Sequence, residues 1–307
     1  MNFGKYCRGR QVTNSVLRVE GLDKTFRKGF AGSVHALNGV SFRVEPGQIT
    51  GFLGANGAGK TTTIKCLLEL AFADSGEIYF FGEKGLSSNA KARIGFLPER
   101  PYFYEYLTGR EFLRFYGELS TRLRKIDLRE QVESLLKRVG LGHAGDRPLR
   151  GYSKGMLQRI GIAQALIHRP ELIILDEPMT GLDPDGRHEV REIIRETSRA
   201  GTAVFFSSHL LPDAEELCER LVILKKGQLA FEGPTTTLLE KVDPHFTIRY
   251  LDSNQMMSLT VQAIDELQDK IDFLRGQNKT VLEVKPGRLK LEEAFLKIAF
   301  DHPGEAI

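Results

Sequence analysis

The chain has 307 residues, enough for roughly two domains at the usual size of about 150 residues each. With 41% hydrophobic and 27% charged residues it can bury a sizeable core, which excludes disordered and fibrous proteins. Lys and Arg number 43 and Asp and Glu 40, and the resulting net charge of +3 excludes binding to a polyanion through bulk charge. Purely apolar runs are only a few residues long, whereas a membrane-spanning helix needs about 20.

The N-terminus and the cysteines predict a protein of a reducing, cytosolic setting. Residues 1–15 are basic and weakly patterned, so we expect a loose leader, and they lack the apolar core of a secretion signal. The three cysteines, Cys7, Cys66 and Cys218, are odd in number and far apart. They therefore predict neither a disulfide framework nor a zinc site.

The first half of the chain begins with strand-like segments. Runs at 17–20 and 40–44 alternate apolar and polar residues, and 48–53 is typical of a buried strand. A glycine-rich loop follows, and then a helix expected over about 60–70. A second helix is predicted at 126–139, where apolar residues recur on one face.

Further strands are predicted at 172–175 and 202–207. Because helices separate these strands, we expect a parallel sheet with crossovers. A hairpin follows over 221–232. After Asp243 and Pro244, alternating strand and helix patterns predict a small α+β domain at about 243–301.

The loop between the strand at 48–53 and its helix matches the phosphate-binding pattern. Glycines allow a tight turn that points N–H groups at a phosphate, and the helix adds the positive end of its dipole. Lys60 is expected to reach the β- and γ-phosphates, and the Thr61 hydroxyl to bind Mg²⁺. The predicted ATP-binding residues here are Gly54, Ala55, Asn56, Gly57, Ala58, Gly59, Lys60, Thr61 and Thr62.

Two carboxylates follow the apolar strand at 172–175. Asp176 is predicted to bind Mg²⁺, directly or through water, and Glu177 to act as general base toward the attacking water. Alone, the pair also fits a buried strand with a polar end. The upstream phosphate loop favours the catalytic interpretation.

With these two motifs, the chain resembles the nucleotide-binding subunit of an ABC transporter over about residues 16–240. The distinguishing stretch is 152–159, which resembles the family signature Leu-Ser-Gly-Gly-Gln. Ser153 and Gly155 match it, whereas Tyr152, Lys154 and Met156 depart from it. This variant is similar to the ABC-2 exporter branch. The resemblance implies that Ser153, Lys154, Gly155 and Met156 contact the ATP of a second copy.

Other positions acquire roles from the same resemblance. Asp183 resembles the D-loop residue that communicates across a dimer, and His209 resembles the switch histidine that contacts the γ-phosphate and serves catalysis. Phe26 resembles the aromatic residue that stacks on adenine. His35 or Phe30 are the alternatives near the base.

Glu99 stands where the family usually has the Gln that ligates Mg²⁺ and senses the membrane subunit. A carboxylate can keep both roles, although it adds negative charge beside the phosphates. We therefore expect Thr61, Glu99 and Asp176 as the Mg²⁺ ligands.

The resemblance implies an α/β fold with a P-loop NTPase core, a mixed sheet with a β-subdomain, and a helical insert at about 98–165. It implies ATP and Mg²⁺ as cofactors, a head-to-tail homodimer, and a separate integral membrane permease as partner. The chain would lie in the cytoplasm on the inner face of the membrane, and ATP hydrolysis would drive export. Docking of the permease is expected near the aromatic segment 101–106.

Two other functions stay open. A soluble ABC ATPase acting on ribosomes or DNA would usually carry two cassettes or sustained heptads, and neither is present. No nucleic acid is expected, because residues 241–307 hold nine basic and eleven acidic side chains. A nucleotide-dependent switch with little turnover is the second alternative, disfavoured by the Asp176–Glu177 pair and His209.

Overall fold

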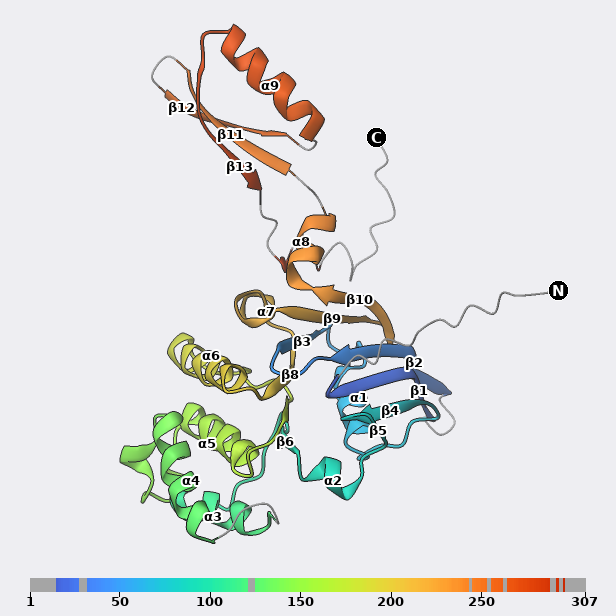
Figure 1. The fold of residues 1–307 in the computed structure, drawn as a ribbon, viewed down its shortest axis with the longest axis vertical. Helices are drawn as coiled ribbons and strands as arrows, with labels where there is room; N and C mark the ends of the chain where they lie inside the picture. Colours follow the sequence, from blue (N-terminus) through green and yellow to red (C-terminus); the bar gives the residue numbers. More distant parts are fainter. Residues whose placement is uncertain are drawn as a thin grey trace, which may run out of the picture.

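A computed structural model of the chain describes residues 15–27, 32–120, 125–242, 245–252, 255–261, 264–287, 291–292 and 295. Figure 1 shows a large α/β body and, beyond α8 and β10, a smaller unit formed by residues 245–287. No helix among these described residues is long and apolar enough to cross a bilayer.

A six-stranded sheet forms the centre of the body, in the order β10-β9-β3-β8-β7-β6. Five strands are parallel, and β10 pairs antiparallel with β9, which confirms the predicted parallel sheet and hairpin. The strands are β3 Ile49–Leu53, β6 Ile94–Leu97, β7 Leu172–Leu175, β8 Ala203–Ser208, β9 Arg220–Lys225 and β10 Gln228–Pro234.

An antiparallel sheet covers one face of the central sheet. Its order is β2-β1-β4-β5, with β1 Leu17–Arg27, β2 Ser33–Val44, β4 Ser75–Phe80 and β5 Glu83–Lys84. Phe42 of this sheet stacks on Phe52 and Phe205 of the central sheet, with ring centroids 5.5 Å apart in both pairs. These rings join the two sheets into one apolar core.

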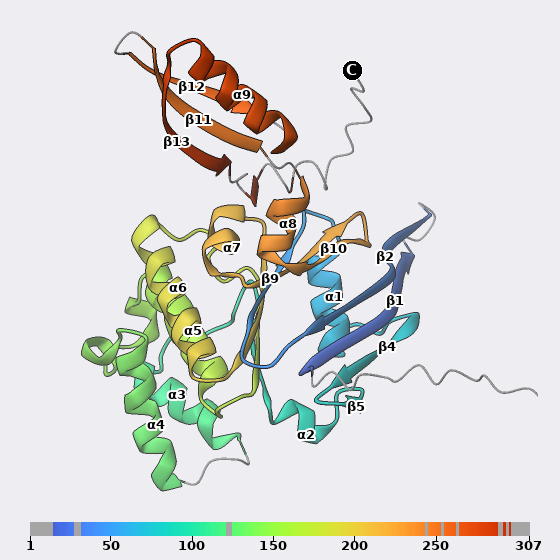
Figure 2. The same ribbon diagram turned by 45° about the horizontal axis from the view of Figure 1, so that its top comes forward.

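Helices α3 to α8 pack in a second core on the opposite face, whereas α1 and α2 lie on the side of the antiparallel sheet (Figure 2). Phe52 and Leu53 are neighbours in β3, and their side chains point to opposite faces of the sheet. Leu53 therefore belongs to the core on the helical side, whereas Phe52 belongs to the core beneath the antiparallel sheet. The predicted helix at 126–139 is confirmed as α4, and Val132, Leu135, Leu136 and Val139 are buried. The α-helices of the body are α1 Lys60–Leu67, α2 Ser88–Lys91, α3 Gly109–Glu118, α4 Lys125–Arg138, α5 Lys154–Leu166, α6 Pro184–Arg199, α7 Leu211–Leu217 and α8 Thr235–Val242.

The smaller unit contains β11 His245–Asp252, β12 Gln255–Val261, α9 Ile264–Gly276 and β13 Thr280–Gly287, with strand order β12-β11-β13. Among its described residues, the buried core consists of Ile248, Val261 and Leu274. Past β13 the chain returns to the body, where Leu291 and Phe295 are buried in the core on the helical side. The backbone N–H of Leu291 donates to Glu215 Oε2 at 3.0 Å. The predicted leader, apart from Ser15, and residues 296–301 lie outside the described residues.

Candidate active site

The glycine-rich loop has the backbone that its sequence requires. Gly57 and Gly59 have φ of 80° and 110°, a region that favours glycine. A Cβ on Gly59 would also lie 2.8 Å from the carbonyl oxygen of Ala36. Helix α1 starts at Lys60, so its N-terminal N–H groups point at the loop. The loop can therefore hold an anionic group at the start of α1.

Lys60 places a buried positive charge between this loop and the carboxylates after β7. Its Nζ donates to the carbonyl oxygen of Gly54 at 2.7 Å and lies 3.5 Å from Glu177 Oε1. The Lys60 side chain is only 7% exposed. A buried ammonium needs anionic or polar partners, and a nucleotide phosphate would supply further ones.

A hydroxyl from the neighbouring strand bonds the Asp176 carboxylate and the backbone of Glu177. Ser207 Oγ donates to Asp176 Oδ1 at 2.6 Å and accepts from the backbone N–H of Glu177 at 2.8 Å. Glu177 has φ of 51°, an unfavourable backbone for a residue with a side chain. The Ser207 bridge holds this turn and so fixes where the Glu177 carboxylate points.

Glu177 Oε2 has two further partners. His209 Nδ1 lies 2.7 Å from it, and Thr180 Oγ1 donates to it at 3.0 Å. The carboxylate is thus oriented from both sides, with Oε1 toward Lys60. This arrangement suits a positioned base, which must be held within hydrogen-bond reach of its proton donor.

Asp176 lies in an environment that opposes its negative charge. Burial raises the pKa of its carboxyl, and the charges of Glu177 and Glu99 raise it further, against the Ser207 hydrogen bond and the charge of Lys60. Glu99 and Glu177 also line one cavity, so their negative charges act on the same region as that of Asp176. A divalent cation would relieve this repulsion.

One cavity of about 530 Å³ brings most of the predicted residues together. Phe26 is at its rim, 41% exposed, beside Val34 and His35, which fits either aromatic stacking or a histidine contact with a base. The other alternative, Phe30, lies outside the described residues. The predicted residues that line this cavity are Phe26, Ala55, Asn56, Gly57, Gly59, Lys60, Thr61, Thr62, Glu99, Glu177 and His209.

The signature residues lie in a different cavity, of about 370 Å³. Ser153 caps α5, its Oγ accepting from Met156 N–H at 3.3 Å, and Asp183 caps α6 by accepting from Gly186 N–H at 2.9 Å. Ser153, Lys154, Gly155 and Asp183 all line this cavity. Within one chain, therefore, the signature and the phosphate loop do not line the same cavity.

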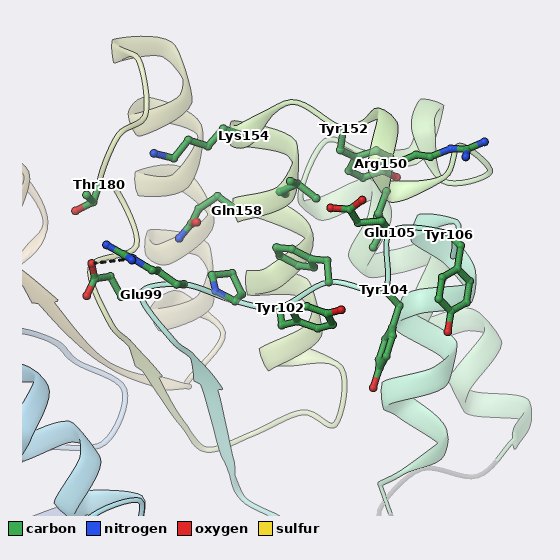
Figure 3. Close-up of a pocket in the computed structure, with 15 residues that line it drawn as sticks. Glu99, Tyr102, Tyr104, Glu105, Tyr106, Arg150, Tyr152, Lys154, Gln158 and Thr180 are labelled. Atoms are coloured by element: carbon green, nitrogen blue, oxygen red, sulfur yellow. Dashed lines mark ion pairs between the residues drawn. The ribbon is translucent and has the colours of Figure 1, made fainter.

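A third cavity, of about 710 Å³, is shown in Figure 3 and shares Glu99 and Thr180 with the phosphate-loop cavity and Lys154 with the signature cavity. Glu99 lies at one end of it and Lys154 across from it, and Tyr102, Tyr104 and Tyr106 follow along the same segment. Glu99 lines both this cavity and the one with the phosphate loop. It is thus placed between the nucleotide region and the aromatic segment.

Ser207 and Thr180 were not predicted to act at the site, although their hydroxyls contact its carboxylates. Ser207 is the second-last residue of a buried strand and Thr180 precedes a glycine, positions where hydroxyl side chains are common. Only the neighbouring motifs give a sequence signal for them.

Known proteins resemble this chain in sequence. Residues 37–180 match the ABC transporter family. YxlF, an uncharacterized ABC transporter ATP-binding protein of Bacillus subtilis, is 38% identical over 92% of this chain and 99% of its own length. The chain belongs to the ABC transporter ATP-binding family. It is also 36% identical to the bacitracin transport ATP-binding protein BcrA of Bacillus licheniformis, over 82% of this chain and 80% of that protein.

The ABC fold is equally clear among solved structures. The ATP-binding subunit of an ABC transporter has a TM-score of 0.65 and 30% identity to this chain, covering 74% of it and 93% of the solved chain. The fold is therefore the P-loop NTPase fold of ABC ATPase domains, as predicted. This ABC protein is an ATP-binding transporter subunit and an ATPase.

Proposed function

We propose that two copies of this ABC subunit close head to tail around two ATP molecules. The phosphate-loop cavity and the signature cavity both occur in one chain and share no lining residue. Ser153 and Gly155 at the start of α5 form a second helix N-terminus suited to an anion. A head-to-tail pair would bring this helix end onto the γ-phosphate bound by Lys60 of the other copy.

Mg²⁺ is the expected metal, held by Thr61, Asp176 and Glu99. A hydroxyl and two carboxylates are the hard oxygen ligands that this ion prefers, and ATP phosphates would complete its shell. In the described part of the chain, no group of three or more His, Cys, Asp or Glu side chains is placed to hold a metal alone. When bound, the ion would neutralise charge on the phosphates.

Hydrolysis would use Glu177 as the base. Its carboxylate takes a proton from water as the water oxygen attacks the γ-phosphorus, and the bond to the β–γ bridging oxygen breaks. His209 and Thr180 hold Oε2 in place for this step. The ADP produced lacks the γ-phosphate that joins the two copies, so the dimer reopens.

Two variants test the dimer site. Glu177→Gln keeps the shape of the base but cannot accept the proton, so turnover falls by about 10²–10⁴-fold while ATP-dependent dimers accumulate. Full ATPase activity in Glu177→Gln contradicts the assigned role. In Gly155→Ala the added Cβ meets no atom within 4 Å in one chain, so the melting temperature is kept while ATP-dependent dimers weaken.

The control for the second variant is Gly142→Ala, whose Cβ also meets nothing within 4 Å but which lies outside all three cavities. It is expected to behave as the wild type in both measurements. ATP-dependent dimers of equal stability in Gly155→Ala and Gly142→Ala would contradict the head-to-tail site.

Coupling to a membrane permease is proposed for the cavity in Figure 3. Tyr102 and Tyr106 are strongly exposed, and such aromatic side chains favour protein contacts. With the bacitracin transport relative, this supports an exporter subunit on the inner face of the membrane. The position of Glu99 between both cavities gives a path from docking to the nucleotide.

Co-purification from membranes tests the coupling. Removing both rings (Tyr102→Ala with Tyr106→Ala) is expected to lower recovery of an integral membrane partner at least tenfold. Phe273→Ala, which removes an exposed ring from α9, is the matched control and keeps recovery. Equal recovery in both variants contradicts the docking site, and the absence of any membrane partner for the wild type favours a soluble ABC ATPase.

A further inference from the structure

The sheet of the smaller unit has two different outer edges. Strand β13 carries Glu283, Lys285 and Pro286, and charges and proline on an edge discourage pairing with another strand. Strand β12, on the other edge, reads Gln-Met-Met-Ser-Leu-Thr-Val over 255–261 and has no charge and no proline. Among the described residues, only β11 pairs with β12. The β12 edge is therefore open for strand addition.

The side chains of β12 give this edge apolar surface as well. Met256 is 68% exposed and Met257 44% exposed. Met257 pairs with Tyr250 and Leu259 with Ile248, so both lie on the face that packs on α9. Few described residues of the unit are buried. A partner strand that buried more apolar surface on this face would therefore add substantially to the core of the unit.

A second copy of β12 is the partner that fits. Two identical antiparallel strands are related by a two-fold axis normal to the sheet, so each face stays on one side. If the axis passes beside Ser258, the central residue of β12, all seven residues of one strand pair with the seven of the other. Gln255 at one end then faces Val261 of the other copy. Met257 then faces Leu259 of the other copy, and Met256 faces Thr260. Strand β12 has no charged side chain that a different protein could recognise. Its own sequence, in contrast, can pair with a second copy of itself along its whole length.

The pairing would also stop at two copies. The joined sheet has the order β13-β11-β12-β12-β11-β13, and both of its outer edges are the charged, proline-bearing β13. Such edges resist a third copy. A closed dimer is therefore favoured over a growing sheet.

We propose that β12 pairs with β12 of a second copy and joins two ABC subunits through a continuous six-stranded sheet. This inference rests on the proposed function, because it adds a second contact to the ATP-dependent dimer. The β12–β12 contact needs no nucleotide. By linking two chains, it raises the effective concentration of one ATPase body near the other.

Disulfide trapping tests the register. In the full chain carrying Cys7→Ser, Ser258→Cys places two thiols across the axis with Cα atoms about 5.5 Å apart, within disulfide range. The remaining cysteines, Cys66 and Cys218, are buried. We expect nucleotide-free Ser258→Cys to form a crosslinked dimer at least tenfold faster than Glu283→Cys, which lies on the charged β13 edge. Equal rates would overturn the inference.

Charge variants test it a second way. Met256 and Thr260 are exposed and would face each other across the axis. Added to Ser258→Cys, Met256→Lys with Thr260→Lys sets like charges opposite one another and should abolish crosslinking, whereas Met256→Lys with Thr260→Glu sets opposite charges and should keep it. Equal crosslinking in the two variants would contradict the pairing.

A separate measurement distinguishes this inference from the proposed function. ATP-dependent dimerisation of Glu177→Gln is followed by size exclusion. If that dimer forms but Ser258→Cys does not crosslink, only the β12 inference fails. If Ser258→Cys crosslinks but ATP causes no dimer, the proposed nucleotide sandwich fails.

Discussion

Helices α6 and α7 begin beside the candidate active site and are joined by a buried ion pair. Arg191 Nη1 donates to Asp213 Oδ1 at 2.6 Å, and the Asp213 side chain is only 2% exposed. Helix α6 follows Asp183 directly, and α7 begins two residues after His209. Replacing Asp213 by alanine is therefore expected to perturb both stability and the position of the proposed catalytic groups.

The magnitude follows from the surroundings of Arg191. Removing one partner of a buried pair costs about 3–5 kcal/mol. Arg191 keeps a second, more exposed partner, because its Nε lies 3.1 Å from Glu216 Oε2. We therefore expect Asp213→Ala to lower the free energy of unfolding by about 2–3 kcal/mol, which lowers the melting temperature by about 4–12 °C in a body of this size.

Thermal unfolding followed by circular dichroism measures the loss, and ATPase activity at 25 °C measures the effect on catalysis. Glu216→Ala is the matched control, since a largely exposed partner contributes about 0–1 kcal/mol. The reasoning would be wrong if Asp213→Ala unfolded within about 0.5 kcal/mol of the wild type, or no earlier than Glu216→Ala.

Three further outcomes are expected. Because its pKa is raised in the folded state, ionised Asp176 destabilises the metal-free protein above that pKa, so Asp176→Asn should raise the melting temperature in EDTA at pH 7.5 by an amount that shrinks as the pH falls toward the unfolded pKa; a constant difference would contradict this. Gly95→Ala places a Cβ 2.1 Å from the carbonyl oxygen of Ala165, and should cost about 3 kcal/mol in denaturant unfolding; a near-neutral effect argues against this close contact. Leu274→Ala removes part of a very small core, so hydrogen exchange should rise over 245–287 while the ATPase body keeps its melting temperature; uniform destabilisation would show that the two units unfold together.

Local patterns were enough to predict the phosphate loop and most strands of the central sheet, although β6 was not among them. A strand, a glycine-rich turn and a helix follow one another within about twenty residues, so the sequence itself contains their arrangement. The carboxylates after β7 were predictable for the same reason. Their closeness to His209 depended on family resemblance, because strand order in space is not written in the spacing.

Long-range packing was not predictable. Nothing in the pattern of 288–298 distinguishes a helix of the smaller unit from a segment that packs on the body, yet Leu291 and Phe295 are buried there. The Ser207 bridge was not predicted, because serine is common near strand ends whether or not it contacts a functional group. The boundaries at 98–165, 240 and 301, and the individual site roles, stay predictions.

The return of Leu291 and Phe295 to the body makes the smaller unit an insertion with two attachments. A protein cut at Asp243 would lose this unit together with two side chains of the ATPase core, and Glu215 would lose its hydrogen-bond donor. Loss of function after such a cut would then report misfolding as readily as lost regulation. Excising 245–287 and joining the flanks with a short flexible linker would keep both core residues, so the role of the unit could be measured on an intact enzyme.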